Sequence, residues 1–101
     1  MKYLKKFEDN NTNTLKKYII IQFIDSGNYF ILRTLSNSNE NIIRYDKYYE
    51  YNENDNEIMG QVSVSIYKNY NDVFNILYQT DDEQDAIDAL KIMIESSKYN
   101  L

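Results

Sequence analysis

Two runs rich in β-branched and aromatic residues, joined by a short polar turn, limit the fold of this chain more than any other feature. The runs are residues 16–25 and 28–36, and the turn between them reads Asp-Ser-Gly-Asn. Glycine adopts the positive φ that tight hairpin turns require, and Asp, Ser and Asn are favoured beside it. The pattern therefore predicts a β-hairpin, around which the other elements must be arranged.

Two later segments have the period-2 pattern of strands. Residues 42–51 alternate: one face would carry Ile43, Tyr45, Lys47, Tyr49 and Tyr51, and the other Arg44, Asp46, Tyr48 and Glu50. Residues 60–68 alternate more cleanly: Val62, Val64 and Ile66 would share one face, and Gln61, Ser63, Ser65 and Tyr67 the other. Both segments are predicted to be strands with one wetter face.

Residues 73–79 fit two templates. As a strand, the segment places Phe74, Ile76 and Tyr78 on one face; as a helix, Val73, Phe74 and Leu77 also share a face. A strand is preferred, because a helix here would run into the next capping signal.

That signal predicts a helix over residues 81–97. Thr80 and Glu83 have the spacing of a capping box, in which the hydroxyl of the first residue accepts from the third amide of the helix. An apolar stripe at helical spacing follows, and it consists of Ala86, Ile87, Leu90, Met93 and Ile94.

The chain is thus predicted to be an α+β domain, with a meander-like antiparallel β-sheet of about five strands and one C-terminal helix packed on one face. A single domain is expected over residues 1–101, with an N-terminal arm (1–14), the antiparallel sheet (15–79) and the C-terminal helix (80–98).

The helix is expected to dock through Ile87, Leu90 and Ile94. Its partner face should carry Val62, Val64 and Ile66, since the other side of that strand is polar. In the first strand, the series Tyr18, Ile20, Gln22, Ile24 contains a glutamine, so the alternate series is expected to be buried instead. That series consists of Ile19, Ile21 and Phe23.

Composition excludes several kinds of site. The chain has no cysteine, so disulfides and thiolate metal sites are impossible, and it has no histidine, which removes the commonest general base. No pairing of the remaining titratable residues indicates catalysis, so the protein is predicted not to be an enzyme and no cofactor is expected. Neither a signal peptide nor a membrane-spanning segment is visible in the sequence, and a cytoplasmic location is expected.

Two acidic clusters have competing interpretations. The run Asp81, Asp82, Glu83, Asp85 fits a metal or acid-base site, but carboxylates are also favoured in the first turn of a helix, and that reading is preferred. The loop over residues 50–57 carries oxygen ligands but lacks the central glycine of a calcium-binding loop, and is interpreted as a solvated turn. No metal site is predicted.

Charge is distributed unevenly. Residues 1–17 carry five lysines against two acidic residues, whereas the remaining residues carry six basic and fourteen acidic groups. Nucleic-acid binding needs clustered Lys and Arg, so direct nucleic-acid binding is not expected. The basic arm is either a solvated segment, the preferred reading, or a contact to phosphate or an acidic partner; its lysines are Lys2, Lys5, Lys6, Lys16 and Lys17.

A tyrosine-rich group is the candidate binding site. Tyrosine combines a large rigid body with a hydroxyl and is enriched at interfaces. The predicted site consists of Tyr45, Tyr48, Tyr49, Glu50, Tyr51 and Tyr67, with Tyr48 and Tyr67 pointing to the polar-leaning sheet face. The alternative is that an AT-rich genome, which favours Tyr and Asn codons, accounts for the cluster without selection for binding.

These features favour a small non-catalytic protein-binding module with an acidic, Tyr-bearing surface. A specific version is a viral or mobile-element inhibitor of a host defence protein, which would act in the host cytoplasm by occupying a basic groove on its partner. The alternative is a self-assembling structural or accessory protein, a homodimer for example, that pairs through sheet edges or through the exposed sheet face. A small enzyme or ligand-binding domain ranks last, because one sheet and one helix leave little room for a pocket.

Overall fold

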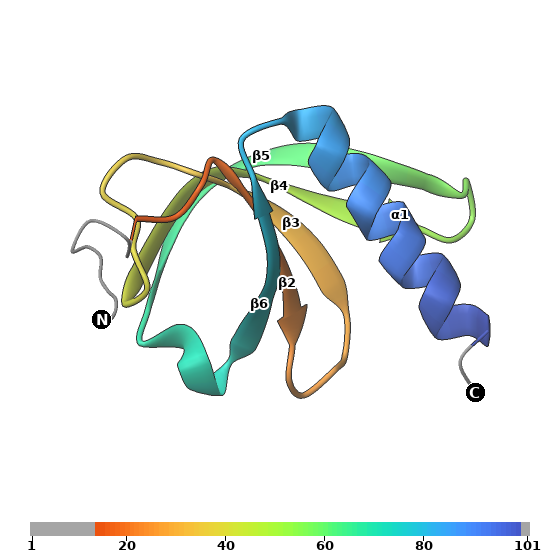
Figure 1. The fold of residues 1–101 in the computed structure, drawn as a ribbon, viewed down its shortest axis with the longest axis horizontal. Helices are drawn as coiled ribbons and strands as arrows, with labels where there is room; N and C mark the ends of the chain where they lie inside the picture. Colours follow the sequence, from red (N-terminus) through yellow and green to blue (C-terminus); the bar gives the residue numbers. More distant parts are fainter. Residues whose placement is uncertain (1–13, 100–101) are drawn as a thin grey trace, which may run out of the picture.

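The computed structural model describes residues 14–99, which fold into one antiparallel sheet and one α-helix (Figure 1). The predicted strands and the C-terminal helix are confirmed, including the strand interpretation of residues 73–79. The predicted N-terminal arm lies almost entirely outside the described residues. In chain order the elements are β2 (Tyr18–Phe23), β3 (Tyr29–Thr34), β4 (Ile42–Asn52), β5 (Glu57–Lys68), the 3₁₀ turn η3 (Tyr70–Asp72), β6 (Phe74–Thr80) and α1 (Glu83–Tyr99).

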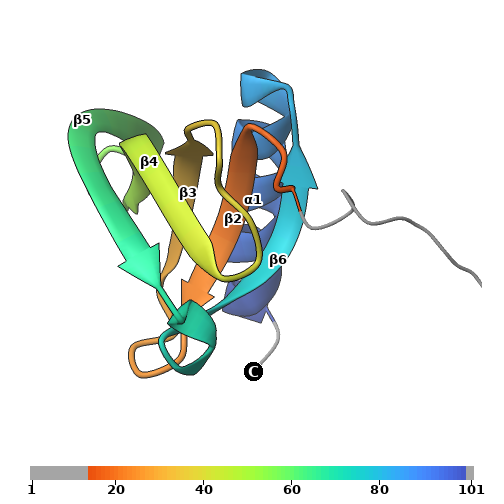
Figure 2. The same ribbon diagram turned by 90° about the vertical axis from the view of Figure 1, so that its left-hand side faces the viewer.

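The sheet has the strand order β5-β4-β3-β2-β6, and every neighbouring pair is antiparallel. The first four strands form a meander, whereas β6 crosses back and pairs with β2. Figure 2 shows the sheet curling so that β5 and β6 form its two edges, with η3 in the crossover between them. The predicted hairpin therefore supplies two of the three interior strands of the sheet.

Asparagine shapes several turns that glycine or proline would shape elsewhere. Gly27 adopts a φ of 75° in the hairpin turn, as predicted, and its N–H donates to the Phe23 carbonyl at 2.8 Å. Asn37, Asn56 and Asn69 also adopt positive φ values. Asparagine tolerates the left-handed region better than most residues with a side chain. A chain without proline and with two glycines can therefore still make tight connections.

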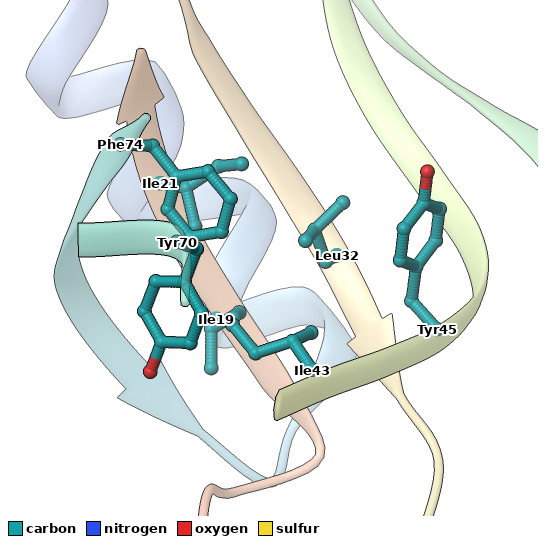
Figure 3. Close-up of a cluster of buried hydrophobic side chains, with 7 residues drawn as sticks. All are labelled: Ile19, Ile21, Leu32, Ile43, Tyr45, Tyr70 and Phe74. Atoms are coloured by element: carbon teal, nitrogen blue, oxygen red, sulfur yellow. The ribbon is translucent and has the colours of Figure 1, made fainter. Parts of the chain in front are cut away.

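Two faces of the curled sheet are distinguished below. The concave face lines the inside of the curl, and the helix face is the outer side, on which α1 packs (Figure 1). The concave core consists of Ile19, Ile21, Leu32, Ile43, Tyr45, Tyr70 and Phe74, and Figure 3 shows these side chains. The core under α1 consists of Tyr18, Ile20, Ile31, Tyr49, Ala86 and Leu90.

Strand β4 changes face at one irregular point. Its pairing with β3 and its pairing with β5 both shift register between Tyr45 and Lys47. Bulges of this kind bend a sheet and reverse the alternation of side chains beyond them. Ile43 and Tyr45 accordingly lie in the concave core, whereas Tyr49 lies under the helix. The prediction that the whole apolar series of this strand shares one face is therefore wrong.

An ion pair spans the same point. The guanidinium group of Arg33 donates to both carboxylate oxygens of Asp46, at 2.8 and 3.1 Å. The hydrogen bonds from Arg33 lower the pKa of the Asp46 carboxyl group. The bulged residue of β4 is thus tied to the strand beside it.

The predicted apolar stripe of α1 is the one that docks, but it docks on the other sheet face. Leu90 is fully buried against Ile20 and Ile31, whereas Ile19 and Ile21 lie in the concave core. The glutamine on which the prediction depended, Gln22, is paired near the hairpin turn. Because β2 is a central strand, it is apolar on both faces, and one polar residue near its end does not mark a wet face.

The prediction for β5 is also wrong. Val62 is 80 % exposed, Val64 75 % and Ile66 38 %, so the helix does not cover this series. The sheet curls away from α1 before it reaches these residues (Figure 2). Within β5, Ile58 packs against the core under α1.

The helix begins two residues later than predicted, and its cap is a different residue. The carboxylate of Asp82 accepts from the Asp85 amide at 2.9 Å, which is the N-cap bond. The hydroxyl of Thr80 instead accepts from the Asp82 amide at 3.2 Å. Glu83 does not reach back to Thr80, because its carboxylate accepts from the Tyr49 hydroxyl. The prediction that Thr80 caps the helix is therefore wrong, although the helix does begin shortly after Thr80 in the chain.

Candidate functional site

An open groove on the concave face is the candidate site, because most of the predicted site residues line it. It has a volume of about 290 Å³ and lies between the hairpin and the ends of β4 and β5. Three of its residues, Ile21, Leu32 and Tyr45, belong to the buried cluster in Figure 3. We call it the aromatic groove; it is lined by Ile21, Phe23, Phe30, Leu32, Tyr45, Tyr48, Glu50 and Tyr67.

Five aromatic rings hold one another in place around this groove. Phe30 forms T-shaped pairs with Phe23, at 5.4 Å between ring centroids, and with Tyr48, at 6.1 Å. Tyr67 stacks on Tyr45 at 5.7 Å, with 18° between the ring planes. Such pairs add to the stabilisation from burial alone and restrict ring motion. The walls of the groove are therefore preorganised.

The aromatic rings pack against the core at the floor of the groove and are partly accessible to solvent at its opening. Tyr45 is buried at the floor, whereas the other four rings are half-buried. The Tyr48 hydroxyl donates to Gln61 on β5 at 2.8 Å, which holds that ring across the strand pair. Apolar surface of this kind remains in contact with water until something covers it.

Glu50 gives the groove its charge. It is the one carboxylate among the lining residues, and within residues 14–99 no cationic group lies at ion-pair distance from it. Burial raises the pKa of the Tyr67 hydroxyl, and the neighbouring Tyr45 adds to the shift. An ordinary tyrosine already keeps its proton at physiological pH, so Glu50 is the one acidic side chain beside this aromatic surface.

The six predicted site residues divide between two faces of the sheet. Tyr45, Tyr48, Glu50 and Tyr67 line the aromatic groove. Tyr49 is 4 % exposed beneath α1, so it is not available to a partner.

Tyr51 lies apart from the groove. It lines a second hollow of about 390 Å³ beside the end of α1, where Lys98 lies over its ring at 5.3 Å. Of the six predicted site residues, four therefore line the aromatic groove, and Tyr49 and Tyr51 lie elsewhere.

Four residues of the groove were missed by the sequence interpretation. Ile21 and Phe23 were assigned to the face beneath the helix, and Phe30 and Leu32 were given no role. Phe23 and Phe30 flank the predicted hairpin turn, and this position contained a signal, since an antiparallel turn brings the residues on its two sides close together.

The acidic clusters have structural roles. Asp82 caps α1, and in the turn between β4 and β5 the carboxylate of Asp55 accepts from the Asn52 side chain at 3.1 Å. In the part of the chain that is described, no group of three or more potential metal ligands comes together. No helix there is long and hydrophobic enough to span a bilayer.

No protein-family model matches this chain, and no curated protein or solved structure gives a significant match, so the groove has to be interpreted from its own geometry.

Proposed function

We propose that this protein is a non-catalytic protein-binding module whose aromatic groove receives an apolar side chain from its partner, next to a Lys or Arg that pairs with Glu50. The observation that carries the proposal is the combination of accessible rings that pack against one another with one carboxylate that has no cationic group at ion-pair distance among the described residues. Aromatic residues are enriched where protein interfaces are buried, and preorganised rings lose little entropy on binding.

The charge of the chain supports a basic partner. Residues 18–101 carry fourteen acidic and six basic groups. A net negative surface accelerates encounters with positively charged proteins, and the effect weakens as salt rises. Inhibition of a basic host protein, as proposed for a viral or mobile element, is a narrower form of the same hypothesis.

An enzymatic role has less support. General acid-base catalysis needs titratable groups within reach of one another, and Glu50 is the one carboxylate on the groove. A tyrosine hydroxyl keeps its proton at neutral pH, and burial raises the pKa of Tyr67 further from that range. The groove therefore fits recognition better than proton transfer.

A defined peptide series tests the proposal. Short peptides with a central Leu, Phe or Trp flanked by Lys and Arg would be titrated into the ¹⁵N-labelled full chain, with charge-reversed Glu peptides as the comparison. Basic peptides should shift the amide signals of Tyr48, Glu50 and Tyr67, and the dissociation constant should rise with salt. The proposal is wrong if basic peptides leave these signals unchanged, or if the charge-reversed series binds equally well.

Variants locate the site. Tyr48→Ala should weaken binding by about tenfold, as expected for a contacted aromatic residue. Tyr78→Ala is the matched control, because Tyr78 is a partly exposed tyrosine on β6 outside the groove. Glu50→Gln should weaken binding by about threefold and flatten the salt dependence. Equal losses in the Tyr48 and Tyr78 variants would contradict the assignment of the groove.

A further inference from the structure

Glu50 is a half-buried carboxylate that has no hydrogen-bond donor of its own in the fold. It lines the aromatic groove, and no residue between 14 and 99 donates a hydrogen bond to its carboxylate or forms an ion pair with it. Lys98, which lines the second hollow together with Glu50, donates instead to the Tyr51 hydroxyl at 3.4 Å. Partial removal of a carboxylate from water is costly unless donors replace the water. Glu50 therefore favours a ligand that brings N–H donors with it.

Tyr48 supplies an aromatic face beside this carboxylate. Tyr48 and Glu50 are two residues apart on β4, beyond the bulge, so their side chains lie on the same face of the strand, about 7 Å apart along it. Among the described residues the Tyr48 ring pairs with one other ring, that of Phe30, which is directly opposite Glu50 on β3. The Tyr48 hydroxyl is held by Gln61. One face of a fixed ring is therefore free of other aromatic rings, next to an unpaired carboxylate.

The guanidinium group of arginine fits these two features better than the ammonium group of lysine. A guanidinium group is planar, stacks on an aromatic face within about 6 Å, and still presents paired N–H donors to a carboxylate. An ammonium group is a compact charge that holds its water more strongly, so it loses more on entering a groove lined by rings. Arg33 and Asp46 form the two-donor arrangement elsewhere in this sheet, at 2.8 and 3.1 Å. A ring and a carboxylate side by side therefore favour arginine.

The surroundings of Glu50 favour the groove side of the sheet over the side of α1. Glu50 and Phe30 line both the aromatic groove and the second hollow beside the end of α1. In the second hollow a cation of the chain is already in place, since Lys98 lies over the Tyr51 ring at 5.3 Å. Among the described residues that line the aromatic groove, none is a lysine or an arginine. The groove thus offers a cation–π position that the chain itself does not fill.

We propose that the aromatic groove selects arginine over lysine, with the guanidinium group stacked on Tyr48 and paired with Glu50. This inference rests on the proposed function and narrows the cationic residue of the partner to one amino acid. The apolar side chain of the partner then occupies the rest of the groove, toward the T-shaped pair of Phe23 and Tyr67. Stacking and charge pairing act on the same guanidinium group, so removal of each contact should change the selectivity in a different way.

Three matched peptides test the selectivity. Each contains one leucine beside a single variable residue, which is Arg, Lys or the neutral isostere citrulline, and each is titrated into the ¹⁵N-labelled full chain. The Arg peptide should bind about fivefold more tightly than the Lys peptide, and the citrulline peptide should bind most weakly. If the Lys peptide shifts the groove amides and binds as tightly as the Arg peptide, the arginine preference is wrong and the proposed function still holds. If no peptide shifts the groove amides, both are wrong.

Two groove variants separate the two contacts. Glu50→Gln should remove most of the advantage of Arg over citrulline, because the charge pairing is lost while the stacking remains. Tyr48→Leu should remove most of the advantage of Arg over Lys, because the stacking is lost while the charge pairing remains. Glu53→Gln and Tyr51→Leu are the matched controls in the second hollow and should leave both advantages unchanged. Circular dichroism checks that all four variants fold. A loss of the preference in the control variants, with the groove variants unaffected, would overturn the proposal.

Discussion

The Tyr49 hydroxyl, on β4, donates a hydrogen bond to the carboxylate of Glu83 in the first turn of α1. The Tyr49 ring is buried and packs edge-on against Tyr18, with 6.3 Å between the centroids. Tyr49, which was predicted to contact a partner, therefore joins the helix to β4, and its hydroxyl has a hydrogen-bond partner within the fold. Three predictions about stability follow from this contact and its neighbours, and a fourth concerns alkaline pH.

Removing the Tyr49 hydroxyl should destabilise the protein. Tyr49→Phe keeps the ring but deletes the donor to Glu83, and the free energy of unfolding should fall by about 1 kcal/mol. Tyr78→Phe is the control: the Tyr78 hydroxyl also donates to a helix carboxylate, that of Asp85, at 2.9 Å, but from a more exposed position. Urea denaturation measures both variants. An equal loss in the two would mean that burial adds nothing to the Tyr49 contact.

Alkaline pH should weaken the fold partly through Tyr49. Burial raises the pKa of this tyrosine above its ordinary value of 10.0, and the adjacent Glu83 adds to the shift. Above about pH 10 the unfolded chain loses this proton while the folded chain keeps it, so stability is complete below that pH and falls as pH rises. Urea midpoints measured from about pH 8 to about pH 11 should fall less steeply in Tyr49→Phe than in the wild type. Identical slopes would contradict the raised pKa.

Asp82 should matter more to the helix than its surface position indicates. Asp82→Ala removes the N-cap acceptor from the Asp85 amide and should cost about 1 kcal/mol of stability. Gln84→Ala is the control in the same turn, since the Gln84 side chain bonds only to the exposed Asp88, and its effect should be within about 0.5 kcal/mol. Thermal or urea unfolding compares the two. If Asp82→Ala does not change the free energy of unfolding, Asp82 is not the residue whose cap stabilises the helix.

Leu90 should be the residue of α1 that contributes most to stability. Its side chain is fully buried between the helix and the sheet, so Leu90→Ala should cost about 2–5 kcal/mol. Ile92→Ala, on the exposed side of the same helix, should change stability by less than about 0.5 kcal/mol. Chemical denaturation distinguishes these outcomes. A Leu90→Ala variant as stable as the wild type would show that α1 does not dock through this stripe.

The sequence identified several residues of the aromatic groove, but it did not show that they form a groove. Tyr45, Tyr48, Glu50 and Tyr67 were named together and do line one groove, but the alternation pattern had placed Tyr45 on the face opposite to Tyr48 and Glu50. Tyr49 was wrongly included, since the bulge between Tyr45 and Lys47 reverses the side on which the later residues lie. A one-residue irregularity leaves no clear mark on a pattern of alternation, so the site could not be separated from the helix contacts in advance.

By itself the sequence determined the elements of this protein. The period of the apolar residues, the Ser-Gly turn and the acidic start of the last segment are local properties, and they identify the strands and the helix without reference to the rest of the chain. The tertiary structure alone decided which apolar series is buried and against what. Ile19 and Ile20 are equally apolar, and both are buried because α1 covers Ile20 on one face while Tyr70 and Phe74 pack with Ile19 on the other. Val62 and Val64 look like core residues in the sequence, and they are exposed because the sheet curls away from the single helix that would have covered them.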